Sequence, residues 1–94
     1  MNEITNKRAN HRIKIIEGQI KGLHKMIDAD EYCMDIMAQS LAIQRSLSSL
    51  SKLVLQNHIE THITSMLSSG DEAQQQKAQL ELVSLYELHN IRGR

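Results

Sequence analysis

The segment RIKIIEGQIKGLHKMI, residues 12–27, decides the fold class that this 94-residue sequence predicts. Its larger aliphatic side chains recur three or four positions apart, which is the spacing of one face of an α-helix. We expect a helix from about Thr5 to about Ile27 whose aliphatic face packs on a partner helix. The residues of this face are Ile13, Ile16, Ile20, Leu23 and Ile27.

A second helix is expected to begin near Glu31. Asp28 and Asp30 are candidate N-cap residues, because a carboxylate accepts hydrogen bonds from the first backbone N–H groups and suits the positive end of the helix dipole. The sequence contains no proline, and nothing interrupts the helical spacing before residues 68–70. The serine-rich stretch RSLSSLSK, residues 45–52, keeps this spacing through its leucines and belongs to the same helix.

The remaining residues predict a third helix. Asp71 can cap it, and aliphatic side chains recur at helical spacing from about Glu72 to about Leu88. Residues 90–94 are expected to form a frayed tail. The sequence thus predicts a single all-α domain over residues 1–94, with three helices in each protomer.

The composition favours an oligomer. Hydrophobic residues make up 40% of the sequence, but it has no Phe or Trp and only two Tyr, so a core must be aliphatic. Such cores suit helices packed on helices, and a chain this short buries too little apolar surface to be very stable alone. No apolar run approaches the roughly 18 residues of a membrane span. Since the N-terminus also lacks an apolar signal segment, we expect a soluble, cytoplasmic protein.

The charges are unevenly distributed along the chain. Residues 1–25 carry six Lys or Arg and two acids, whereas residues 26–94 carry five Lys or Arg and nine acids. A net charge of zero therefore hides parts of +4 and −4. The basic N-terminal part predicts a localised anionic partner.

The segment NHIETH, residues 57–62, contains a candidate metal-binding pair. His58 and His62 are four positions apart, on one face of a helix, where both imidazoles can reach one ion. Two unrelated surface histidines are the alternative. Glu60 lies one position too late for the H-E-x-x-H motif of zinc proteases, so a protease is not expected.

The single cysteine is the candidate third ligand. Cys33 precedes His58 by 25 positions. That is about 37 Å along a continuous helix, so the two cannot bind one ion within a chain. If two copies of the second helix pack antiparallel about residues 45–48, Cys33 of one protomer lies beside His58 and His62 of the other. Such an antiparallel helix-bundle dimer contains two equivalent sites and covers the aliphatic faces of both chains.

The sequence resembles the CsoR/RcnR-type metal-sensing transcriptional repressors of bacteria. The resemblance covers nearly the whole chain, and it implies an all-α dimer that doubles to a homotetramer. It also implies binding of operator DNA without a helix-turn-helix motif, and release of the DNA when an inducer binds between protomers. The segments that carry it are RIKIIEGQIKGLHKMI (12–27), DEYCMDIMAQSLAIQRSL (30–47) and NHIETHI (57–63).

Matched by position, Cys33, His58 and His62 correspond to the family's three metal ligands. Copper sensors of the family usually have a second cysteine where this chain has His62. Nickel and cobalt sensors often have histidine there but add another at the extreme N-terminus, where this chain has Met1. His11, ten positions later, or the α-amino group could complete a larger coordination shell.

The ligand types favour one inducer over the others. One thiolate and two imidazoles suit three-coordinate Cu(I), whereas Zn(II) prefers four ligands and Ni(II) four to six. Family members that sense sulfur species need two cysteines, and those that sense formaldehyde have an N-terminal proline, which this chain lacks. The sequence therefore favours Cu(I), with Ni(II), Co(II), Zn(II) or formaldehyde as alternatives.

Two further residues match positions that surround the ligand histidine in the family's copper sensors. These are Tyr32 and Glu81. A hydrogen-bond partner on the second ring nitrogen would fix the tautomer and direction of the imidazole. The alternatives are a packing aromatic for Tyr32 and a solvated carboxylate for Glu81.

The basic residues of the first and second helices predict a DNA-binding surface. Arg12 and Gln19 match recurrent positions of the family, and the other members follow from charge alone: Lys7, Lys14, Arg45 and Lys52. These side chains would neutralise phosphates. A solvated helix face is the alternative.

A metal storage or delivery protein without a DNA-binding role is the competing class. It would use the same three ligands, but it would not need a basic first helix. An enzyme is not expected, because nothing in the sequence pairs a nucleophile with a base.

Overall fold

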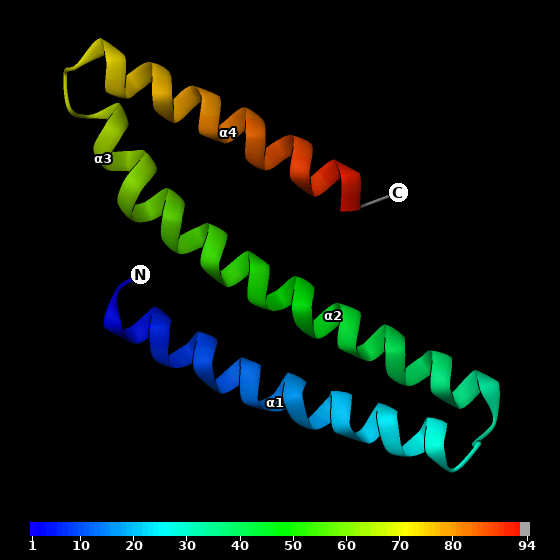
Figure 1. The fold of residues 1–94 in the computed structure, drawn as a ribbon. Coiled ribbons are helices and arrows are strands. Elements are labelled where there is room, and N and C mark those ends of the chain that lie inside the picture. The colour runs from blue at the N-terminus through cyan, green and yellow to red at the C-terminus, as the bar shows by residue number, and fades with distance from the viewer. Residues whose placement is uncertain (93–94) are drawn as a thin grey trace. The chain divides into compact units, whose positions relative to one another are not determined.

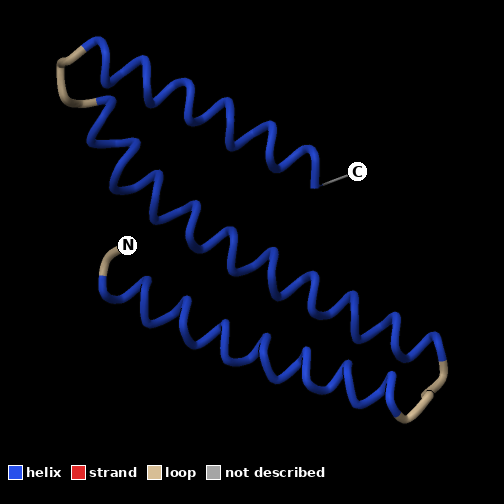
Figure 2. The backbone as a smooth tube through the Cα atoms, viewed as in Figure 1, coloured by secondary structure: helices blue, strands red, loops and turns tan. Residues whose placement is uncertain are grey.

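The computed structural model describes residues 1–92, which contain helices and no strand (Figure 1, Figure 2). This confirms the predicted all-α fold with three long helices, whereas the oligomeric state stays a prediction. In chain order the elements are α1 (Glu3–Asp28), α2 (Cys33–His58), the π-helical turn η1 (Ile59–Ile63), α3 (Thr64–Leu67) and α4 (Glu72–Arg92).

The chain forms two compact units, of which the first is Met1–Asn57 and the second begins at His58. The single domain expected over residues 1–94 therefore stays a prediction. None of the helices within the described part of the chain is both long enough and apolar enough to span a lipid bilayer.

In the first unit, α1 and α2 run antiparallel (Figure 1). Helix α1 begins earlier than expected, because the side chain of Asn2 accepts a hydrogen bond of 2.8 Å from the backbone N–H of Thr5 and caps the helix. Ile16 of α1 and Ile43 of α2 are buried, with 3% and 7% exposure. The remaining large aliphatic side chains of these helices stay at least partly exposed in one chain.

The aliphatic face predicted for α1 is only partly covered within the chain. Ile16 is buried and Leu23 is half-buried. Ile13, Ile20 and Ile27 are 37%, 49% and 54% exposed. These three residues are seven positions apart, and seven residues make nearly two helical turns, so they form a separate row on one side of α1. The predicted face therefore splits into a buried part and an open row.

The turn between α1 and α2 differs from the sequence prediction. The backbone N–H of Asp30 donates to the carbonyl of Ile27, and that of Glu31 donates to Met26, both at 3.0 Å. Together with the left-handed φ of 52° at Asp30, this is a Schellman ending of α1.

The prediction that Asp28 or Asp30 caps the second helix is wrong. Asp28 is the last residue of α1, and Asp30 belongs to its C-terminal turn. The carbonyl of Tyr32 accepts the first hydrogen bond of α2, from Ile36 at 3.2 Å. Asp30 lies in this turn because the turn needs a residue that tolerates positive φ, and Asp does so better than most residues.

The second unit begins with the π-helical turn η1, which the sequence pattern did not predict. Helical backbone angles continue through His58 and Thr64 on either side of it, and α3 ends at Leu67, close to the predicted break at residues 68–70. The structure explains the turn locally, because the hydroxyl of Thr64 donates to the carbonyl of Ile59 at 2.7 Å. A π turn inserted into an α-helix is common at functional sites.

Helix α4 is capped as the sequence predicts. The Asp71 carboxylate accepts a hydrogen bond of 3.0 Å from the backbone N–H of Ala73. Buried Ala78 of α4 and Ile63 of η1, at 0% and 2% exposure, form the apolar centre of this unit. Helix α4 extends to Arg92, so the expected tail is helical up to that residue, and residues 93–94 lie outside the described chain.

Candidate metal centre and nucleic-acid interface

His58 and His62 lie side by side, as their spacing predicts. His58 is the last residue of α2, and His62 lies in η1. The two imidazole centroids are 5.0 Å apart with 24° between the ring planes, so the rings stack. An imidazole binds a metal through a lone pair in its own plane. Because stacked rings do not direct their lone pairs at a common point, at least one ring must turn before both bind one ion.

Glu81 of α4 contacts the first of these histidines. Its Oε1 lies 3.0 Å from Nε2 of His58, and the two side chains are 32% and 30% exposed. The second carboxylate oxygen, Oε2, is buried and accepts no hydrogen bond from the described residues. The contact fixes the position of the imidazole and leaves Nδ1 of His58 as its available nitrogen.

Cys33 and Tyr32 lie in the other compact unit, at the start of α2. Tyr32 is 71% exposed and Cys33 is exposed as a free thiol. Among the residues that the structure describes, no three His, Cys, Asp or Glu side chains gather as a metal ion requires. The predicted ligands that the structure brings together are thus His58 and His62.

The predicted DNA-binding residues differ in their exposure and in their contacts with other side chains. Lys14, Arg45 and Lys52 are exposed. Lys7 is also exposed and lies 3.6 Å from Glu3, but an ion pair so open to water contributes little. These side chains keep their charge available to an anionic partner.

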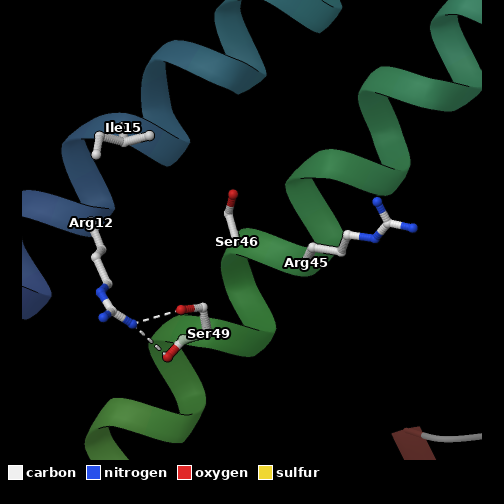
Figure 3. A pocket seen from close by; sticks show the side chains of 5 residues that line it. All are labelled: Arg12, Ile15, Arg45, Ser46 and Ser49. Atoms are coloured by element: carbon white, nitrogen blue, oxygen red, sulfur yellow. Dashed lines mark hydrogen bonds between the residues drawn. The ribbon is translucent and has the colours of Figure 1, made fainter.

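Arg12 contacts α2 through its side chain, whereas Gln19 does so through its backbone oxygen. Nη1 of Arg12 donates to the backbone oxygen of Ser49 at 2.8 Å and to its hydroxyl at 2.6 Å (Figure 3). Gln39 donates through Nε2 to the backbone oxygen of Gln19 at 3.1 Å. The Arg12 contacts use one of three guanidinium nitrogens, and a guanidinium has five N–H donors, so Arg12 keeps donors for a phosphate.

A groove of about 410 Å³ lies between α1 and α2 beside this contact. Figure 3 shows the Arg12 guanidinium turned toward Ser49, while the Arg45 guanidinium points away from that contact. The groove is lined by Arg12, Ile15, Arg45, Ser46 and Ser49. Two arginines from different helices therefore border one groove, where their charges can attract an anion.

Sequence reasoning missed several polar residues that shape these sites. Ser49 holds Arg12, and Thr64 supports η1. The hydroxyl of Thr61 lies 3.0 Å from Nδ1 of His62. The sequence gives little signal for such contacts, because serine and threonine at helical positions usually face water or their own backbone.

Comparison with known proteins identifies the family. The family model described as metal-sensitive transcriptional repressor matches residues 5–91. The chain belongs to this family, which confirms the resemblance seen in the sequence. The family is one of repressors, in agreement with the expectation that the chain is not an enzyme.

The individual relatives are copper-sensing transcriptional repressors named CsoR. Those of Mycobacterium bovis (strain BCG / Pasteur 1173P2) and Mycobacterium tuberculosis (strain H37Rv) are 36% identical over 70 residues, covering 72% of this chain and 59% of theirs. That of Bacillus subtilis (strain 168) is 34% identical over 64 residues, covering 68% of this chain and 63% of its own length. The aligned part thus spans about three fifths of the length of these relatives.

The fold matches that of a solved member of the family. The crystal structure of the copper-sensing repressor CsoR with Cu(I) from Geobacillus thermodenitrificans NG80-2 is similar with a TM-score of 0.76 and 25% sequence identity. The match covers 93% of this chain and 91% of that one.

Proposed function

We propose that this protein is a Cu(I)-responsive transcriptional repressor that binds operator DNA without metal and releases it when Cu(I) binds. The observation that carries the proposal is the pair His58 and His62, side by side with Glu81 on the first ring, in a chain of the metal-sensitive repressor family. The ligands are Cys33 of one protomer with His58 and His62 of the other.

The choice of Cu(I) is supported by ligand chemistry and by the names of the relatives. A thiolate and two imidazoles form a three-coordinate site that suits Cu(I), whereas Zn(II) and Ni(II) need more donors. The CsoR relatives are copper-sensing, and the similar crystal structure contains Cu(I). Nickel, cobalt, zinc and formaldehyde are the competing inducers, because His62 stands where copper sensors usually have cysteine.

The open apolar surfaces of the first unit support assembly into a dimer and then a tetramer. Ile13, Ile20 and Ile27 form one exposed row on α1. On α2, Met34 and Met37 are 61% and 63% exposed. Exposed apolar surface of this extent is typical of protein interfaces. An antiparallel pair of α2 helices would cover part of it and bring Cys33 to the histidines of its partner.

Glu81 supplies a connection between metal binding and helix position. An ion held by Nδ1 of His58 would make the ring a stronger donor toward Oε1 of Glu81, and this contact would hold α4 more firmly on η1 and the end of α2. The metal must bind the low-affinity DNA state better than the other state. A typical coupling of about 1 to 3 kcal/mol gives a 5- to 150-fold change in DNA affinity.

The DNA is bound through the basic surface of the first unit. Lys7, Lys14, Arg45 and Lys52 are exposed, and Arg12 reaches the groove between α1 and α2. Contacts of this kind neutralise phosphates and release counterions, so the affinity for DNA should fall steeply with salt.

An anaerobic titration followed by fluorescence anisotropy of labelled promoter DNA tests the proposal. The metal-free protein should bind the DNA preceding its own gene, and one Cu(I) per protomer should release it, whereas Ni(II), Co(II) and Zn(II) should be weaker inducers. Stronger release by one of these ions would reassign the inducer. Copper binding without any DNA binding at low salt would favour a storage or delivery protein.

A further inference from the structure

The two imidazoles of the candidate metal centre contact the protein through different nitrogens. His58 uses Nε2, which lies 3.0 Å from Oε1 of Glu81. His62 uses Nδ1, which lies 3.0 Å from the hydroxyl of Thr61. The nitrogens left for a metal ion are therefore Nδ1 of His58 and Nε2 of His62.

We propose that Thr61 is a positioning residue that accepts the Nδ1–H of His62, so that the outer nitrogen Nε2 keeps its lone pair for the metal. The inference rests on the proposed function, in which His62 is a ligand. An ionised carboxylate only accepts hydrogen bonds, so Glu81 places the proton of neutral His58 on Nε2. A threonine hydroxyl can donate or accept, and only the accepting arrangement leaves Nε2 of His62 unprotonated.

The backbone of η1 holds Thr61 and His62 in this arrangement. The carbonyl of Ile59 accepts both the backbone N–H of Thr64 and its hydroxyl, the latter at 2.7 Å. The same N–H also reaches the carbonyl of Thr61. These hydrogen bonds close the π turn around Thr61 and His62. The fixed backbone of the turn keeps the Thr61 hydroxyl beside the His62 imidazole.

His62 depends on Thr61 for its position more than His58 depends on any neighbour in the chain sequence. The side chain of His58 is 30% exposed and is held by a residue of α4, whereas His62 is exposed. In the proposed site the stack of the two rings has to open, and we expect the more exposed ring, that of His62, to turn. A hydroxyl on the adjacent residue can keep the proton on Nδ1 during this movement.

The tautomers can be measured in the metal-free protein by 15N NMR of the imidazoles, with His62→Asn to assign the signals. We expect His62 in the Nδ1–H form and His58 in the Nε2–H form. Thr61→Val should shift His62 toward the Nε2–H form, whereas Thr61→Ser should keep the wild-type spectrum. An Nε2–H form of His62 in the unchanged protein would overturn the inference.

Cu(I) affinity, measured by anaerobic competition with a chromophoric chelator, gives the second readout. Thr61→Val should lower the affinity about 10- to 100-fold, the usual effect of losing a partner of a metal-bound imidazole. Thr61→Ser, which keeps the hydroxyl, should bind Cu(I) as tightly as the unchanged protein. Thr5→Val, the same chemical change in α1 as Thr61→Val, should also leave the affinity unaltered. Wild-type affinity in Thr61→Val would contradict the role of Thr61.

The two proposals fail separately. If His62→Asn binds Cu(I) as tightly as the unchanged protein, His62 is not a ligand and the proposed metal site is wrong. If His62→Asn loses Cu(I) but Thr61→Val does not, the metal site stands and Thr61 has no positioning role. Circular dichroism of each variant shows whether its helices are intact.

Discussion

Cys33 in the first unit and the histidine pair in the second unit, the proposed metal ligands, differ in how far their surroundings hold them in place. The pair is already assembled: its rings are 5.0 Å apart, and Glu81 and Thr61 each contact one of them at 3.0 Å. Cys33 is an exposed thiol at the first residue of α2, and its neighbour Tyr32 is 71% exposed. In the proposed site, one chain would thus supply two positioned nitrogen donors and leave its sulfur donor open for a partner.

Apolar surface does not follow this contrast, because both units leave large side chains exposed. The second unit buries Ile63, at 2% exposure, but its Leu80 and Tyr86 are 63% and 67% exposed. The first unit leaves Ile20 of α1 and Met37 of α2 49% and 63% exposed. The unit with the exposed thiol therefore shares with the other unit the exposed apolar side chains that an interface between protomers would cover.

The largest effect is expected from Cys33→Ser, which tests whether the first unit contributes the sulfur donor. Cu(I) affinity should fall by more than about 100-fold, because changes outside the ligand set already cost about 10- to 100-fold. Metal-free DNA binding should be unchanged, since the basic residues are untouched. Competition titration and anisotropy measure the two quantities, and spontaneous release of DNA by this variant would count against the proposed switch.

The next prediction compares a buried and an exposed isoleucine of α1. Ile16→Ala should lower the free energy of unfolding by about 2 to 5 kcal/mol, because it leaves a cavity in the first unit. Ile20→Lys should keep the helices intact and yield a smaller species, because it places a charge in a protomer interface. Thermal unfolding and sedimentation velocity measure these outcomes. An unchanged assembly in Ile20→Lys would show that the exposed row faces water.

A smaller effect is expected from Glu81→Gln, which tests how far the histidine pair is prepared. The amide keeps the shape of the side chain but loses the charge that fixes Nε2–H on His58. Cu(I) affinity should fall about 10-fold, and Cu(I) should release DNA less completely. Glu87→Gln, which changes an exposed carboxylate of the same helix, is the matched control. Equal behaviour of the two variants would assign Glu81 to a purely structural role.

The smallest effect concerns the basic surface. Lys14→Gln should weaken DNA binding at every operator sequence and reduce the slope of log affinity against log salt by about 1. Lys77→Gln on α4 removes the same charge outside the predicted surface and should leave the slope unaltered. A lower slope with Lys77→Gln and not with Lys14→Gln would place the DNA on the second unit.

The elements that could be predicted are those that depend on local pattern. The all-α class, the break at residues 68–70 and the cap at Asp71 follow from residue spacing and side-chain chemistry, and the structure confirms them. The end of α1 was misread because Asp suits two positions, a helix N-cap and a left-handed turn residue. Only the competing hydrogen bonds around Asp30 decide between these positions.

The contacts of the candidate site also divide into those that residue spacing predicts and those that depend on the folded chain. Four-residue spacing brings His58 and His62 together whatever the rest of the chain does, and the structure brings Glu81 to His58, as the family resemblance suggested. The contact of Thr61 with His62 depends on the π turn, and that of Arg12 with Ser49 depends on the packing of α1 on α2. Neither leaves a pattern in the sequence.

The sequence by itself determined the helical class and the chemical types of the proposed ligands, because hydrophobic period, capping residues and side-chain donors act over a few neighbouring positions. Tertiary structure alone decided which face of α1 is buried, where the helix after α2 widens into a π turn, and which nitrogen of each histidine is engaged. These features depend on hydrogen bonds and packing between residues distant in the chain or on a choice between nearly equal local geometries, and only the folded chain makes that choice.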